Sequence, residues 1–149
     1  MQRNRRWLVV AGLLAAGLQL SACTQQTAEA DRATSEPAKV EHVAGSDVSR
    51  LTLTARAVER LGIQTAPVRK ATVEGLARTV VPYGAVLYDA TGATWVYVTR
   101  EPLSYLRERI TVDDIEGDLA VLTDGPAVGT AVVSVGASEL YGTEFGVGH

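Results

Sequence analysis

Residues suited to acid–base or nucleophilic chemistry are few in this chain of 149 residues. The chain has two histidines, His42 and His149, one cysteine, Cys23, and one methionine, Met1. A nucleophilic triad needs a histidine held beside its nucleophile, whereas His42 lies in a polar stretch and His149 ends the sequence. We therefore expect both histidines to be solvated and expect no enzyme, although the sequence does not exclude a pair of carboxylates. Because there is also no phosphate loop, no dinucleotide fingerprint and no thioether pair for a soft metal, we expect no cofactor.

The acidic run Asp113-Asp114-Ile115-Glu116-Gly117-Asp118 invites a test for calcium binding. An EF-hand loop has glycine at position 6 and carboxylates at positions 1 and 12. Aligning Gly117 with position 6 places Val112 at position 1 and Thr123 at position 12. The spacing fails, so we interpret the run as a solvated turn and expect no metal site.

The start of the chain has the pattern of an export signal. Three arginines among the first six residues precede a short apolar stretch, residues 7–18. This stretch is too short for a spanning helix, which requires about 20 apolar residues, and is typical of a signal peptide. Leu20-Ser21-Ala22-Cys23 then resembles a bacterial lipobox, in which small residues lead to a cysteine that is lipidated and becomes the new N-terminus.

We therefore predict a signal peptide over residues 1–22 and a lipid on Cys23 that anchors the chain to the outer face of the cytoplasmic membrane. An incidental thiol near this junction is the alternative. The sequence leaves open whether export follows the general secretory or the twin-arginine route.

The composition behind this leader limits the partners. Without residues 1–22 the chain loses three arginines and no acid, so 11 basic residues face 17 acidic ones and the net charge falls from −3 to −6. An acidic chain without a basic cluster argues against nucleic acid as a partner. Residues 23–48 are mostly small and polar, which predicts a flexible tether, whereas residues 142–149 form a glycine-rich tail. The folded domain is expected over residues 49–141.

Alternating side chains predict that this domain is mostly β. Residues 80–98 form two strand-like runs around Thr91-Gly92, a pattern typical of a β-hairpin. In the second run Trp95 and Tyr97 would point one way and Val96 and Val98 the other, and we expect Trp95 to be largely buried.

Further strands are predicted over residues 51–54, 63–68, 103–112, 119–122 and 130–135. One short helix, Ala55 to Leu61, would be capped by Thr54 and stopped by Gly62. The predicted fold class is a small β-roll or barrel-like domain with one short helix.

Several of these segments occur in the order of a known family. Val81-Pro82, Gly92, Trp95-Val96-Tyr97-Val98, the run from Gly125 to Val133 and Gly136-Ala137-Ser138-Glu139-Leu140 together resemble the final domain of periplasmic adaptor (membrane fusion) proteins of tripartite efflux pumps. The similarity covers about residues 80–141. An earlier segment, Leu51-Thr52-Leu53-Thr54 followed by residues 61–68, is similar to the opening segment of such adaptors.

The resemblance implies a membrane-proximal domain from which the distal domains are missing. In full-length adaptors several hundred residues separate the two segments, whereas here only Arg69 to Thr79 lie between them. We therefore expect residues 51–68 and the C-terminal strands to form one sheet, joined by a surface turn or an edge strand.

The function that this resemblance implies is docking on a membrane transporter as an accessory of an efflux system. The residues expected at that interface are Tyr83, Tyr105, Arg107 and Arg109. The alternative is a stand-alone surface lipoprotein that binds a small ligand or a cell-wall component. A docking domain should expose an apolar or aromatic patch, whereas a ligand binder should enclose a pocket.

Overall fold

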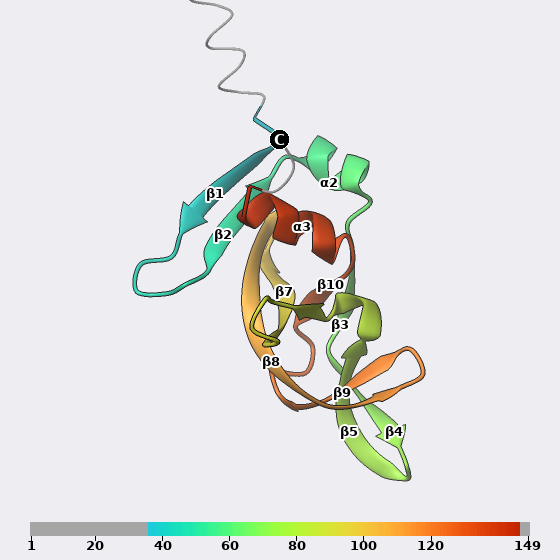
Figure 1. The fold of residues 1–149 in the computed structure, drawn as a ribbon. Helices are drawn as coiled ribbons and strands as arrows, with labels where there is room; N and C mark the ends of the chain where they lie inside the picture. The colour runs from blue at the N-terminus through green and yellow to red at the C-terminus, as the bar shows by residue number, and fades with distance from the viewer. Residues whose placement is uncertain (1–35, 147–149) are drawn as a thin grey trace, which may run out of the picture. The chain divides into compact units, whose positions relative to one another are not determined.

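The computed structural model describes residues 36–146 of the chain. Cys23, the expected signal peptide, the first part of the expected tether and His149 lie outside the described residues. Among the residues described, no helix is long and apolar enough to cross a membrane. The strands are β1 (Ala38–His42), β2 (Ser49–Leu53), β3 (Gln64–Pro67), β4 (Arg69–Val73), β5 (Leu76–Pro82), β6 (Leu87–Tyr88), β7 (Thr94–Glu101), β8 (Ser104–Glu116), β9 (Leu119–Asp124) and β10 (Ala131–Val135). The helices are α2 (Ala55–Leu61), α3 (Ala137–Glu144) and the 3-10 turn η1 (Tyr83–Ala85) (Figure 1).

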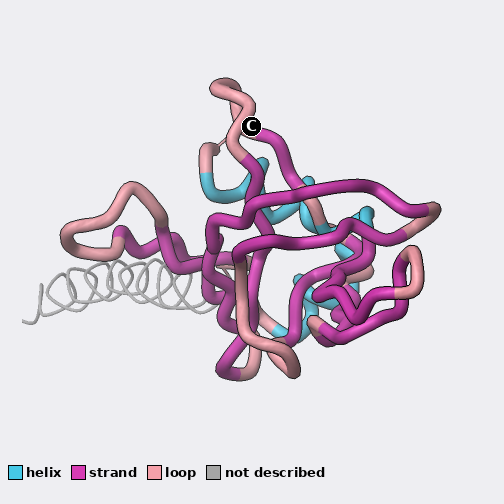
Figure 2. The backbone as a smooth tube through the Cα atoms, turned by 90° about the horizontal axis from the view of Figure 1, so that it is seen from below, coloured by secondary structure: helices cyan, strands magenta, loops and turns pink. Residues whose placement is uncertain are grey.

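One curled sheet dominates the described part of the chain. Its strands follow the order β3-β10-β7-β8-β9-β5-β4, with β2 pairing to β8, β1 to β2, and β6 to β7. The two ends of this order, β3 and β4, are consecutive in the chain and are separated only by Val68. The Val68 amide donates to the Thr130 carbonyl, and the Gly129 amide donates to the Val68 carbonyl, both at 2.8 Å. The sheet therefore curls back toward itself, as the magenta strands in Figure 2 show.

Strand β8 is the longest strand and takes part in both halves of the sheet. Its first half pairs with β2 and β7, and its second half pairs with β9. Register shifts at residues 111–114 mark an irregularity where the pairing changes, a device that bends a strand. The acidic run expected to be a turn from Asp113 onward is therefore mostly strand: β8 continues to Glu116, and the reversal lies at Gly117. Pairing with β9 outweighs the weak strand preference of the acidic residues.

Two main apolar clusters lie on opposite faces of the sheet. Inside the curl are Val68, Val81, Ala85, Val96, Val98, Ile110, Ala120, Leu122 and Val132. On the outer face the helices and β2 cover Tyr97, Tyr105 and Val133, and the cluster also includes Leu51, Leu53, Ala57, Ala137 and Leu140. The predicted alternation along β7 is confirmed, with Val96 and Val98 facing one cluster and Tyr97 facing the other.

The predicted fold class is confirmed: the domain is mostly β, with a half-barrel sheet. The helix Ala55–Leu61 also has its predicted ends. The Thr54 hydroxyl accepts from the Ala57 amide at 3.2 Å, and Gly62 ends the helix in the left-handed conformation with φ 64°. The expectation that residues 51–68 join the sheet of the C-terminal strands is confirmed too, because β2 pairs with β8 and β3 pairs with β10.

Three segments differ from expectation. Val80–Pro82 belong to β5 and pair with β9, so the strand opposite β7 in the hairpin is only the short β6. Pro82 withholds an amide and η1 turns the chain after it, which interrupts the run. Residues 38–42, placed in the tether, form β1 because they pair with β2. A second helix, α3, extends to Glu144, within the segment expected to be a glycine-rich tail.

Candidate functional site

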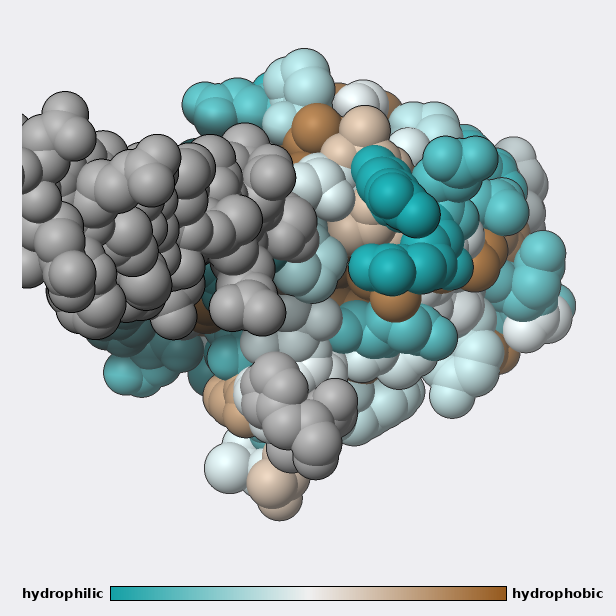
Figure 3. All heavy atoms as spheres, turned by 90° about the horizontal axis from the view of Figure 1, so that it is seen from above, coloured by the Kyte–Doolittle hydropathy of each residue, from teal (hydrophilic) through white to brown (hydrophobic). Residues whose placement is uncertain are grey.

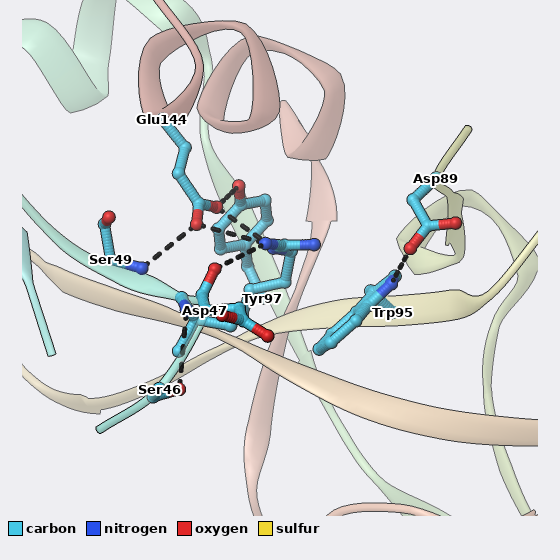
Figure 4. Close-up of polar contacts among 9 residues, drawn as sticks. Ser46, Asp47, Ser49, Asp89, Trp95, Tyr97 and Glu144 are labelled. Carbon is cyan, nitrogen blue, oxygen red and sulfur yellow. Dashed lines mark hydrogen bonds and ion pairs between the residues drawn. The ribbon is translucent and has the colours of Figure 1, made fainter. Parts of the chain in front are cut away.

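The most buried polar group of the domain is centred on Glu144, near the end of α3 (Figure 4). Its carboxylate accepts hydrogen bonds from the Ser49 amide at 3.0 Å and the Tyr97 hydroxyl at 2.5 Å. The Arg107 guanidinium donates to the same carboxylate from Nε at 3.1 Å and from Nη2 at 3.3 Å. Helix α3 is thereby attached to β2, β7 and β8 at one point.

Aromatic rings surround the Arg107 guanidinium. Its central carbon lies 4.3 Å from the ring centroid of Trp95, 5.1 Å from that of Phe145 and 5.8 Å from that of Tyr141. Only 5% of the Arg107 side chain and 3% of the Glu144 side chain are exposed. A planar guanidinium suits such a site because it stacks on rings while its edge donates to a carboxylate.

The contacts of Arg107 and Glu144 hold helix α3 against the sheet, and we call this cluster the internal clamp. Burial raises the pKa of Tyr97, and the hydrogen bond to Glu144 raises it further. In the described part of the chain, every buried side-chain nitrogen or oxygen has a hydrogen-bond partner. The cluster is therefore satisfied within the domain, and its contacts connect the first and last parts of the fold.

The structure corrects the predicted interface at two positions. Tyr105 is 5% exposed and belongs to the outer cluster, while Arg107 is 6% exposed and paired to Glu144. Both lie on the face of β8 that helix α3 covers. Tyr83 and Arg109 do lie at the surface.

Asp89 organises the turn between β6 and β7. Its carboxylate accepts from the Thr91 hydroxyl at 2.7 Å, the Thr91 amide at 2.8 Å and the Ala93 amide at 3.0 Å. The Trp95 indole also donates to it, at 2.9 Å (Figure 4). These bonds, led by those from Thr91 and Trp95, hold the pKa of Asp89 far below its usual range. Most of Trp95 is buried without the ring being fully enclosed, which agrees with the expectation that it is largely buried.

The exposed aromatic residues beside this turn form the candidate contact surface. Tyr83, in η1, is 43% exposed, and Tyr88, in β6, is 55% exposed. Partial burial raises the pKa of Tyr88, and the neighbouring Tyr83 raises it further. Val135, 47% exposed, follows Ser134, whose carbonyl oxygen approaches Gly84 of η1. We call Tyr83, Tyr88 and Val135 the tyrosine rim.

The rim is held in place by backbone contacts. The Tyr83 amide donates to the Asp118 carbonyl at 2.7 Å, and Ala85 is fully buried in the inner cluster. Elsewhere the surface is mixed: the face shown in Figure 3 is largely hydrophilic, with separate apolar patches between the polar side chains. Tyrosine offers a large apolar ring with a polar tip and is enriched at protein interfaces.

Two hollows in the described domain are small. One, of about 140 Å³, is lined by residues that include Arg50, Arg100 and Leu106; the other, of about 190 Å³, lies along residues 122–128. Sites for drug-sized ligands occupy roughly 300–1,000 Å³. Among the described residues, no group of three or more His, Cys, Asp or Glu side chains could hold a metal ion.

Sequence reasoning missed Glu144, Tyr88 and Asp89. A signal for Glu144 was available, because Ala137, Leu140, Tyr141 and Glu144 are spaced i, i+3, i+4 and i+7, as on one face of a helix. Asp89, two residues before Thr91, has the position of an Asx-turn residue.

No protein-family model matches the chain, and no curated protein matches it. Among solved structures, the chain is similar to an NMR structure of 180 residues of SilB from Cupriavidus metallidurans CH34, which encompasses the N-terminal metal-binding site and the membrane-proximal domain of that protein. The TM-score is 0.45 at 18% sequence identity, and the match covers 71% of this chain and 68% of that chain.

Proposed function

We propose that this chain is an exported, lipid-anchored domain of the efflux-adaptor type that docks on a membrane transporter. The observation that carries the proposal is the pairing of β2 with β8 and of β3 with β10. These pairs join the two segments that resemble the opening and the end of adaptor proteins. Both segments therefore belong to one folding unit.

The β4–β5 hairpin replaces the missing distal part. It pairs from Arg69 with Val80 to Val73 with Leu76, and its tight turn is made by Glu74 and Gly75, both with positive φ. A hairpin of this length leaves the sheet intact, as a direct join between the two adaptor-like segments requires. The proposal therefore assigns the chain a role at the transporter itself and not in the reach toward an outer channel.

Anchoring by Cys23 would keep the domain near the membrane. Fourteen residues lie between Cys23 and the start of β1 at Ala38. A flexible chain of that length spans about 20 Å on average, and at most about 50 Å when fully extended. The partner would then be a protein whose extracytoplasmic part lies close to the bilayer.

Docking is assigned to the tyrosine rim, with Arg109 beside it. The guanidinium carbon of Arg109 lies 5.9 Å from the ring centroid of Trp95, which links this charge to the Asp89 turn behind the rim. Exposed tyrosines next to an arginine have the composition of an interaction surface.

The anchoring part of the proposal is tested by labelling. Cells that express the full chain are fed a radiolabelled fatty acid, and the protein is isolated from the membrane fraction. Label should enter the unchanged chain and be absent from Cys23→Ser. Equal labelling of the two proteins would exclude Cys23 as the lipid site.

The docking part is tested by photo-crosslinking in intact cells. A photoreactive phenylalanine replaces Tyr88, and in a control it replaces Val128, which is 53% exposed in the loop before β10. The probe at Tyr88 should capture an integral membrane transporter, and the probe at Val128 should not. Capture of only cell-wall components, or equal capture by both probes, would refute docking through the rim.

A further inference from the structure

The outer edge of β1 is an open strand edge. β1 pairs with β2 on one side, and in the described residues no strand pairs with its other side. Figure 1 shows β1 at the margin of the fold, outside β2. An open edge is a template for pairing with another strand, and proteins guard such edges with charges when pairing is unwanted.

The hydrogen bonds at the two ends of the β1–β2 ladder show which backbone groups face outward. The Thr54 amide donates to the Pro37 carbonyl at 3.0 Å, and the Val43 amide donates to the Val48 carbonyl at 3.1 Å. Odd-numbered residues of β1 therefore direct their N–H and C=O groups toward β2. Because bonding alternates along an antiparallel strand, Ala38, Val40 and His42 direct theirs toward the open edge.

Two side chains of opposite charge, Lys39 and Glu41, flank Val40 in this strand. Val40, 45% exposed, lies opposite the fully buried Leu51 and continues the apolar face outward. On the other face, Lys39 Nζ lies 2.8 Å from Glu41 Oε1, with 69% and 49% of these side chains exposed. Lysine, valine and glutamate thus follow one another with the valine at the centre.

We propose that this edge pairs with the same edge of a second copy of the chain, antiparallel and with a two-fold axis at Val40. In this register Val40 meets Val40, and Ala38 meets His42 of the second copy. These residues direct their backbone groups outward, so each pair can exchange both N–H···O bonds. Lys39 then lies opposite Glu41 of the second copy. The two residues form a non-hydrogen-bonded pair, in which the side chains approach most closely.

The charges select this register among the alternatives. Only residues 38, 40 and 42 can form bonded pairs, so the neighbouring registers shift the strands by two residues. One of them places Lys39 opposite Lys39, and the other places Glu41 opposite Glu41. Like charges directly opposite one another destabilise a pair. Lys39 and Glu41 therefore disfavour pairing with an uncharged strand, whereas a second copy of the chain places an opposite charge beside each of them.

Disulfide trapping in the full chain tests the pairing. Two Val40 residues in a bonded antiparallel pair have Cα atoms about 5.5 Å apart, within the range that a disulfide spans. Membranes from cells that express Val40→Cys are treated with a mild oxidant, and the disulfide-linked dimer is measured. Val128→Cys is the matched exposed control, and the parent chain gives the background from Cys23. Val40→Cys should form several-fold more dimer than either.

Charge reversal then tests the register. Combined with Val40→Cys, Lys39→Glu or Glu41→Lys should each lower the dimer yield about tenfold, because like charges then face one another twice. Expressed together, the two charge variants should restore the yield, since their edges are complementary to each other. A dimer yield from Val40→Cys no higher than from Val128→Cys, or one that the charge reversals leave unchanged, would overturn the proposal. Loss in both single variants without restoration in the mixture would overturn it equally.

Discussion

Replacing Glu144 by alanine should strongly destabilise the domain. The substitution removes the acceptor of the Ser49 amide, the Tyr97 hydroxyl and two nitrogens of Arg107. It leaves the Arg107 guanidinium enclosed by aromatic rings without a counter-charge. Removing one partner of a buried ion pair costs about 3–5 kcal/mol.

That cost is a large share of the stability of a single domain, which is about 5–15 kcal/mol. For a domain of this size it corresponds to a fall in Tm of about 12–20 °C. Glu144→Gln should cost less, because the amide oxygen still accepts hydrogen bonds. The control is Glu139→Ala on the same helix, where the exposed side chain bonds only Ser138, and it should stay within about 0.5 kcal/mol of the parent.

The assay is urea and thermal unfolding followed by circular dichroism. Hydrogen exchange along α3 would show whether the helix detaches first. A double substitution, Arg107→Met with Glu144→Leu, should cost less than the two single changes combined, because no charge is then left buried. If Glu144→Ala unfolds within 1 kcal/mol of Glu139→Ala, the reasoning from burial is refuted.

Three further predictions concern stability. Trp95→Ala should cost about 1–3 kcal/mol in urea unfolding, below the 3–5 kcal/mol of an enclosed ring, because Trp95 is not fully buried; a cost near zero would make Trp95 a surface residue. Because the pKa of Tyr97 is raised by burial, the folded state keeps a proton that the unfolded state loses near pH 10. Stability should therefore be intact below about pH 10 and fall by up to about 1.4 kcal/mol per pH unit above it. Tyr97→Phe should remove this part of the slope, and an unchanged slope would contradict the assignment. A chain that starts at residue 36 should melt as the full domain does, whereas one that starts at residue 49 should melt lower, because β1 no longer covers the edge beside Leu51; equal melting would show that β1 adds no stability.

Local features of the fold were predictable from the sequence. Thr54 and Gly62 define the ends of α2 by capping geometry that involves only neighbouring residues. The alternation of Tyr97 with Val96 and Val98 required only the two-residue period of a strand. That residues 51–68 join the sheet of the C-terminal strands was expected from the resemblance of two segments to one family.

Features that depend on distant contacts were not predictable in the same way. β1 contains only one large apolar residue, Val40, and is ordered through its pairing with β2. Arg107 was expected at the surface because a lone charge is rarely buried, but its partner Glu144 lies 37 residues away, in the segment that was expected to be a tail. Sequence spacing cannot pair groups that far apart, so the clamp emerges only from the fold.

Docking through the tyrosine rim is tested by identifying the protein that a photoreactive residue at position 88 captures in intact cells. Docking predicts an integral membrane transporter, captured from position 88 and not from Val128. It also predicts that capture is lost when Tyr83 and Val135 are both changed to serine while the melting temperature is kept. Capture of a cell-wall component alone, or of the same proteins from both positions, would contradict it.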